Sequence, residues 1–203
     1  MTDPITLYGL TPVPSSPTTL FTSTPSPPHH PTHTPFLTTL PIPQTPLSTR
    51  INEYALANLP TPTYNHSRRV YHYGLAIRNY RFPFPEWEFD DETWFCACLL
   101  HDIGTTGVNL ERSRLSFEFK GGLLALGVLQ KRQHQQEGED GGDGEGDGIT
   151  PQDQAESIAE AIIRHQDLCS KGNITDLGQL LQLASLLGIS THPPISPEYS
   201  TEC

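Results

Sequence analysis

The sequence predicts an all-α domain that follows a proline- and threonine-rich arm. Helical spacing of apolar residues begins near residue 48 and recurs in six segments, most of them bounded by prolines or polar residues. No strand pattern of comparable strength appears anywhere in the chain. With 203 residues, part of them polar and proline-rich, one compact domain is expected.

The arm, residues 1–47, is expected to be extended or disordered. Its first 46 residues hold 12 prolines and 12 threonines, a composition that buries too little apolar surface to offset the entropy of ordering the chain. It lacks the charged segment and continuous apolar run of a secretory signal, and no segment approaches a membrane span. We therefore expect a cytoplasmic protein without a membrane partner.

The domain itself is expected over residues 48–188. Its helices are predicted at about 48–58, 64–80, 90–101, 116–130, 151–163 and 175–187, with Asp90 or Asp91, Thr150 and Thr175 at helix starts. Residues 137–149 contain only glycine, acidic residues and one isoleucine before Thr150, so we expect a flexible acidic insertion rather than an EF-hand. Residues 189–203 form an atypical tail that we expect to be disordered.

The formal net charge of -11 argues against a nucleic-acid surface, although six acidic residues lie between Glu137 and Asp147. Four cysteines, with Cys96 and Cys98 two residues apart, do not form a disulfide framework. The apolar faces of the helices at 116–130 and 175–187 leave two alternatives open: a homo-oligomer surface, or the trace of a missing segment.

Three histidines lie on the apolar stripes of three different helices. His66 precedes Val70 by one turn, His101 ends the stripe of its helix, and His165 follows Ile162. A single such histidine is more often a core residue bonded to a carbonyl. Three of them at helix termini could converge where the helix ends meet.

Asp102 follows His101 directly at a helix end. A buried aspartate beside a buried histidine is costly unless a cation or a strong donor compensates it. Adjacent helical residues point about 100° apart, yet one metal beyond the helix end can be reached by both. Imidazole and carboxylate ligands suit zinc, iron or manganese, and the sequence does not choose between them.

Four short segments carry a resemblance to a known family. They are residues 64–71 (YNHSRRVY), 101–106 (HDIGTT), 116–119 (SFEF) and 161–167 (AIIRHQD). With these segments, the sequence resembles the fungal cyanamide hydratase family of the HD superfamily over about residues 48–183. The resemblance implies an HD-type helical bundle.

The resemblance further implies hydration of cyanamide, or a similar nitrile, to urea at one divalent metal, usually zinc. His66, His101 and Asp102 would hold the metal, and Asp102 and His165 would serve catalysis. His165, Thr105, Trp94 and Phe117 would line the substrate site, with Phe119 as a further wall. Aromatic residues at helical spacing, however, more often simply fill a core.

The sequence departs from the family near its end. Gly188 falls where the family has an aspartate that closes the metal site, and the departure after about Leu183 suggests a shifted reading frame or a mis-set splice boundary. Asp167 and Asp176 are weaker substitutes. Two other functions stay open: another HD-type phosphohydrolase, for which the nearby cations are only Arg112 and Arg114, or an inactive truncated family member.

Overall fold

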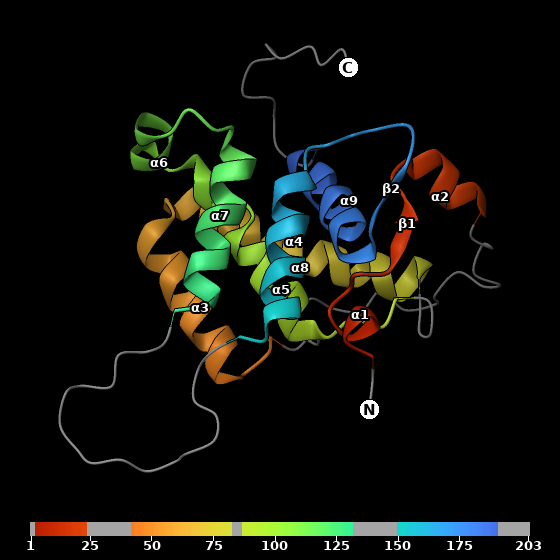
Figure 1. Cartoon of the computed structure of the whole chain (residues 1–203), viewed down its shortest axis with the longest axis horizontal. Helices are drawn as coiled ribbons and strands as arrows, with labels where there is room; N and C mark the ends of the chain where they lie inside the picture. The colour runs from red at the N-terminus through yellow and green to blue at the C-terminus, as the bar shows by residue number, and fades with distance from the viewer. Residues whose placement is uncertain (1–2, 24–41, 83–86, 132–149, 191–203) are drawn as a thin grey trace.

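A computed structural model of the chain describes residues 3–23, 42–82, 87–131 and 150–190 (Figure 1). The expectations for residues 1–2 and 24–41 of the arm, for the acidic insertion and for residues 191–203 lie outside these residues. The described part is predominantly helical with a two-stranded sheet, which confirms the all-α class.

The elements follow one another in chain order. They are α1 (Pro4–Leu7), β1 (Pro12–Pro14), α2 (Pro17–Ser23), α3 (Pro46–Asn58), α4 (Thr61–Arg81), α5 (Asp91–Leu100), the 3-10 turn η2 (Ile103–Thr105), α6 (Gly107–Arg112), α7 (Phe117–Leu129), α8 (Gln152–Arg164), β2 (Asn173–Thr175) and α9 (Asp176–Ser190). None of the helices in the described part combines the length and apolarity needed to cross a bilayer.

Helix α5 is the centre of the bundle. Its residues from Thr93 to Leu100 are all buried, and it packs against α3, α4, α8 and α9. A helix that is apolar all round is stable only when neighbours cover every face. The Asp90 side chain begins the helix by accepting the Thr93 N–H at 2.5 Å, as the sequence predicts. The C-terminal end of α5 therefore lies among other helices rather than in solvent.

Two glycines allow the closest helix contacts. A Cβ built on Gly74 would lie 1.9 Å from the Trp94 ring, so α4 crosses α5 with the indole against bare backbone. A Cβ on Gly122 would lie 2.5 Å from Ile163 and 2.9 Å from the Ala159 carbonyl, where α7 packs on α8. Gly122 weakens the helical prediction locally, but its missing side chain is what lets α7 approach α8.

The expectation of an extended or disordered arm is wrong for residues 3–23. β1 pairs with β2 in antiparallel register, with Val13 opposite Ile174. Ser157 donates to the Tyr8 carbonyl, and Leu20 is buried. These partners lie about 150 residues away along the chain, so no local pattern reveals them, and the prolines of β1 limit it to an edge strand.

The remaining differences between the predicted and the observed elements concern helix starts and short segments. Thr150 does not cap α8: its hydroxyl donates to the Leu129 carbonyl at 2.9 Å, and Pro151 occupies the cap position. Thr175 does begin α9 as expected, because its hydroxyl accepts the Gly178 N–H at 3.1 Å. The short helix α6 and the turn η2 were not predicted, because segments of six residues or fewer carry little periodicity.

Gly74→Ala should destabilise the protein, because its methyl group has no room beside Trp94. We expect a loss of about 1–3 kcal/mol, as for other overpacked cores. Gly127→Ala is the matched control: nothing lies within 4 Å of a Cβ there, and an alanine inside an exposed helix should stabilise by roughly 0.5–1 kcal/mol. Thermal unfolding measures both. Equal effects of the two changes would contradict the packing described at Gly74.

Candidate metal centre

Two neighbouring functional residues, His101 and Asp102, lie at the C-terminal end of α5. His101 occupies the cap position after Leu100, and its Nδ1 lies 2.7 Å from the Cys98 carbonyl oxygen. Because a carbonyl only accepts, Nδ1 carries the proton and donates. The last carbonyls of a helix lack intrahelical partners, so the imidazole satisfies one of them. The lone pair is then left on Nε2, which lies 3.3 Å from Asp102 Oδ2.

His165 uses the same arrangement at the end of α8. Its Nδ1 donates to the Ile162 carbonyl at 2.6 Å, and its side chain is fully buried. Nε2 lies 4.0 Å from Asp102 Oδ1 and has no hydrogen-bond partner among the described residues. A buried ring nitrogen with an unused lone pair is costly, so a proton donor or a cation is expected at this point.

His66 reaches the same carboxylate from α4. Its Nε2 lies 3.8 Å from Asp102 Oδ2, and its ring centroid lies 5.2 Å from that of His101. The side chains of His66 and Asp102 keep 17% and 18% of their surface exposed, whereas those of His101 and His165 are buried. Small molecules therefore have access to the cluster from the side of His66 and Asp102.

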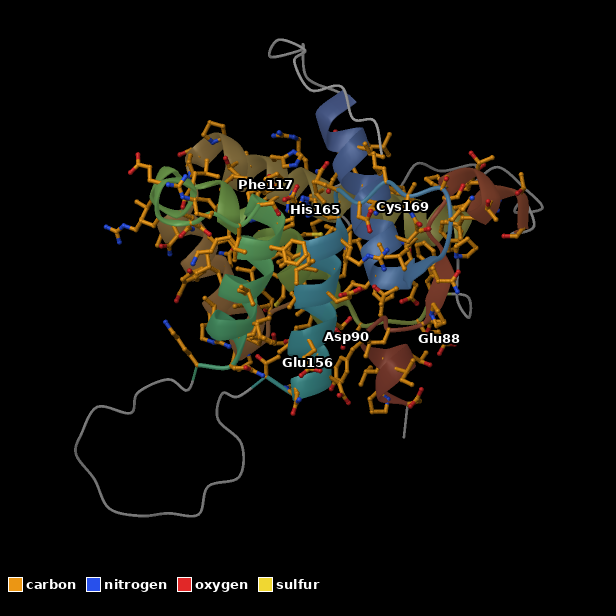
Figure 2. The ribbon with its side chains drawn as sticks, turned by 45° about the horizontal axis from the view of Figure 1, so that its top comes forward. Glu88, Asp90, Phe117, Glu156, His165 and Cys169 are labelled. Carbon is orange, nitrogen blue, oxygen red and sulfur yellow. The ribbon has the colours of Figure 1, made fainter. Side chains whose placement is uncertain are left out.

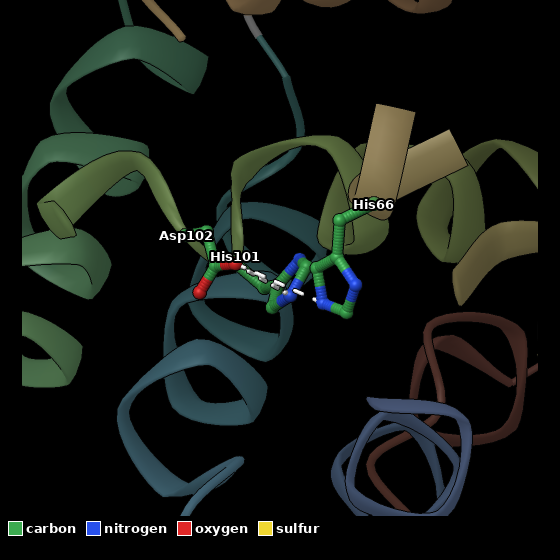
Figure 3. Close-up of side chains that lie close together, drawn as sticks. All are labelled: His66, His101 and Asp102. Carbon is green, nitrogen blue, oxygen red and sulfur yellow. Dashed lines mark ion pairs between the residues drawn. The ribbon is translucent and has the colours of Figure 1, made fainter. Parts of the chain in front are cut away.

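Three of these residues have the arrangement of a metal site. One ligand atom each from His66, His101 and Asp102 lie within 4.8 Å of one another (Figure 3). Two imidazoles and a carboxylate are the ligands of zinc and of similar divalent metals, at about 2.0–2.2 Å from the ion. The Cys98 carbonyl fixes the tautomer of His101 from behind, as backbone carbonyls do for metal-binding histidines.

Burial controls the charge state of the whole cluster. Burial, and for His66 and His165 also repulsion from the charged form of His101, lowers the pKa of all three histidines to about 4. Burial also raises the pKa of Asp102, which the two histidines His66 and His165 oppose. At neutral pH the imidazoles are uncharged and their lone pairs are free. The residues present thus fit a divalent cation, which would compensate the buried carboxylate.

Thr105 and Phe117 both lie next to the cluster. The Thr105 hydroxyl donates to the Asp102 carbonyl at 2.7 Å and holds the turn that follows the helix. The Phe117 ring meets His165 edge to face, with the centroids 5.8 Å apart, and Figure 2 shows these two side chains side by side. Phe117 can therefore form one wall beside His165, while Thr105 supports the backbone of Asp102.

Trp94 does not join the site, contrary to the sequence-based expectation. It lies two helical turns before His101, about 10 Å along the axis. Its indole N–H donates to the Tyr71 carbonyl at 3.1 Å, and its ring packs on Gly74 within the core. Because every face of α5 is buried, the helical period does not show which of its side chains face the site. Phe119, the further wall candidate, is 54% exposed on the surface.

Residue 188 lies beside the cluster. A Cβ built on Gly188 would lie 2.8 Å from His66 Cε1, so this position of α9 touches the imidazole but offers no ligand. Neither substitute aspartate joins the cluster. Asp167 is paired with Arg164 at 3.0 Å, and Asp176 is buried at the start of α9, where it accepts the Leu177 N–H.

Sequence reasoning missed three contributions to the site. The Cys98 and Ile162 carbonyls orient two histidines, and the signal for them was a histidine three residues later at a helix end. The third is Glu118, whose negative charge acts on both Asp102 and His165. It lies in the first turn of α7, where an acidic residue is usually explained by the helix dipole alone.

His101→Ala should abolish zinc binding while leaving the helix content largely unchanged. The substitution removes a buried nitrogen that is held in the ligating tautomer, and we expect zinc to fall from about one ion per chain to near zero. His72→Ala, on α4 outside the cluster, is the control and should keep its metal. Elemental analysis and circular dichroism give the two readouts. Unchanged zinc content in His101→Ala would rule out this site.

In the metal-free protein, the stability that the three histidines of the cluster contribute should fall as the pH falls from about 6.5 towards 4. The three histidines have pKa values near 4 when folded and near 6.5 when unfolded, so the unfolded chain binds more protons across this interval. The raised pKa values of Asp90, Asp102 and Asp176, the last of about 7, act in the opposite direction, so the contribution of a single histidine is measured as the difference between wild type and a variant that lacks it.

Thermal unfolding of chelator-treated protein between pH 7.5 and 5 measures this dependence. His165→Gln should flatten the curve, because it removes one of the groups that must be neutral in the folded state. A pH dependence that is identical in the two proteins would contradict the neutral state assigned to His165.

Comparison with known proteins identifies the family. The model of the HD domain family matches residues 63–187. Cyanamide hydratase DDI2 and cyanamide hydratase DDI3 of Saccharomyces cerevisiae are each 40% identical to the chain over 148 residues, which is 73% of this chain and 58% of each relative. The chain thus spans about 58% of the length of these relatives, and the predicted resemblance to cyanamide hydratases is confirmed. The chain belongs to the HD domain family.

Proposed function

We propose that this protein hydrates a small nitrile, with cyanamide as the substrate and urea as the product, at one divalent metal, most simply zinc. The observation that carries the proposal is the convergence of three imidazoles from separate helices on the carboxylate of Asp102. The names of the two yeast relatives support the choice of substrate.

His66, His101 and Asp102 would hold the metal. A divalent ion held by these residues would supply water with a pKa lowered towards neutrality, the nucleophile that a poorly electrophilic nitrile carbon requires. Three protein ligands are sufficient for a catalytic zinc and leave a position open for water or substrate. Gly188 contributes no fourth ligand, so we propose weaker metal retention than an aspartate at this position would give.

His165 would move the proton. Hydration joins the oxygen of water to the nitrile carbon and transfers both water protons to the nitrile nitrogen, with no oxidant and no leaving group. The free lone pair of His165 Nε2 can accept a proton from the attacking water and return it to that nitrogen. Asp102 Oδ1, 4.0 Å from Nε2, stabilises the transient imidazolium.

The surroundings of the cluster favour an uncharged substrate over the phosphate of a phosphohydrolase. A phosphate group needs cationic donors around it, and the two cations considered from the sequence, Arg112 and Arg114, are both exposed at the end of α6 and just beyond it. Arg69 on α4 is the cation whose charge acts on His66. The buried groups of the site, His101 and His165, are imidazoles with lowered pKa values. An uncharged substrate suits these surroundings better than a polyanion.

Zinc-loaded protein should release urea from cyanamide and no phosphate from nucleotides. His165→Asn should lower kcat by roughly 10²–10⁴-fold, the usual contribution of a general base, with zinc content unchanged. Phosphate release without urea would favour the phosphohydrolase instead. Bound zinc with neither product would identify an inactive family member, and full activity in His165→Asn would remove the assigned proton-transfer role.

A further inference from the structure

Residues 7–15, which we call the docked segment, lie across the first turn of α9. The Asp176 N–H donates to the Thr11 carbonyl at 2.8 Å, and the Leu177 N–H donates to the Gly9 carbonyl at 3.3 Å. Within the same segment β1 pairs with β2, the strand directly before α9 (Figure 1). The first N–H groups of a helix have no partner inside it, so the docked segment supplies acceptors that solvent would otherwise provide.

The docked segment fits closely against α8 and α9. Gly9 has a φ of 67°, and a Cβ built on it would lie 2.8 Å from the Leu177 Cβ and 3.0 Å from the Phe89 ring. Glycine is the residue that adopts this conformation without a steric cost. The Tyr8 carbonyl accepts the Ser157 hydroxyl of α8 at 2.5 Å. These contacts leave little room between the docked segment and the two helices.

The Asp176 carboxyl group is buried beneath the docked segment. Asp176 is 1% exposed, and its carboxyl oxygens accept the Leu177 N–H at 2.9 Å as well as the backbone N–H groups of Asp176 itself and of Thr11. Thr11 belongs to the docked segment, so the acid is shielded from water by the chain that it binds. Burial raises the pKa of Asp176 to about 7, because these hydrogen bonds offset only part of the lost hydration.

Backbone groups, rather than charged side chains, oppose the effect of burial on Asp176. Arg78 of α4 is paired with Asp91. Arg164 of α8 is paired with Asp167 and Glu160. The other ionisable side chains on the parts of the chain that flank the first turn of α9 are Tyr8, Tyr80, Arg81, Asp90, Cys169 and Lys171. The ionisation of Asp176 is therefore governed by whether the docked segment covers it.

We propose that Asp176 and the docked segment form a pH-sensitive switch: protonated Asp176 keeps the segment docked, and ionised Asp176 favours its release. A neutral carboxyl group tolerates burial under the segment, whereas a carboxylate without a cation gains from returning to water. Release would leave the first turn of α9 without the Thr11 and Gly9 carbonyls, and the same helix carries Gly188 beside His66 near its other end. The switch does not depend on the proposed hydratase activity.

The docked state loses stability as the pH rises. The Asp176 carboxyl group has a pKa of about 7 when it is covered and about 3.9 in water, so the docked state binds more protons than the released state between pH 4 and 7. The equilibrium constant for opening should therefore rise across this interval, by at most about tenfold for each pH unit, and should level off above about pH 8. The histidine cluster responds in the opposite direction, so the two dependences can be separated.

Amide hydrogen exchange of the whole chain measures the opening directly. The N–H groups of Asp176 and Leu177 donate to the docked segment, and the Ser15 N–H donates to the Gly172 carbonyl at 3.1 Å, so all three should exchange only after opening. Exchange is followed from pH 5 to 8.5 and corrected for the intrinsic effect of pH on amide exchange. Amides of the buried helix α5 report global unfolding in the same sample.

In wild type we expect the opening constant to rise by at least about tenfold from pH 5 to 7. Asp176→Asn keeps an acceptor for the Leu177 N–H but carries no charge, so its opening constant should change by less than about twofold. Asp153→Asn is the matched control: Asp153 is an exposed acid in the first turn of α8 whose charge acts on Tyr8, and this variant should keep the wild-type dependence. An equal pH dependence in wild type and Asp176→Asn would overturn the switch.

Carboxyl-carbon NMR tests the wild-type chain and does not require any variant to fold. The Asp176 signal should titrate near pH 7 in the docked state, far above the range of an exposed aspartate. A midpoint near pH 4, with the Asp176 and Leu177 amides still protected, would also overturn the switch, because the docked segment would then accept the charged form.

Discussion

The structure depends on holding one largely desolvated carboxylate, Asp102, among imidazoles at the end of a fully enclosed helix, with 18% of its side chain exposed. A carboxylate there is stable only if proton donors or a cation compensate its charge, because little water reaches it and an unpaired charge is costly. The ends of α5 and α8 also fix the tautomers of two of these imidazoles. His101 and His165 each donate from Nδ1 to a carbonyl in the last turn of their helix, at Cys98 and Ile162. The same bonds leave both lone pairs on Nε2, towards Asp102.

The packing of the bundle keeps this arrangement rigid. α5 ends inside the bundle because its whole length is covered, and bare backbone at Gly74, Gly104 and Gly122 lets α4 and α7 approach their neighbours closely. The contact at Gly104 matters most for the site, since it joins the turn after Asp102 to the start of α7. A side chain there would separate Phe117 from His165. Core packing and site geometry are therefore set by the same few contacts.

The sequence was sufficient to predict the histidine cluster but not everything around it. His66, His101 and His165 lie at the ends of apolar stripes, and a period of 3.6 residues assigns each to a buried face. Trp94 was assigned to the site wrongly. Because α5 is apolar all round, the spacing of its apolar residues does not indicate which face of the helix lies towards the site. Glu118 was missed because an acidic residue in a first helical turn is explained without any ligand. The order of residues 3–23 was missed because it comes from distant partners and not from composition.

Those distant partners connect the arm to the site through α9. The first turn of α9 is held by the arm: the Asp176 N–H donates to the Thr11 carbonyl at 2.8 Å, and the Leu177 N–H donates to the Gly9 carbonyl at 3.3 Å. Near the other end of the same helix, Gly188 lies against the His66 ring. A helix is stiff over this length, so the position of its first turn determines where residue 188 lies. A segment with little helical pattern of its own thereby helps to fix the wall behind His66, the histidine most accessible to an incoming substrate.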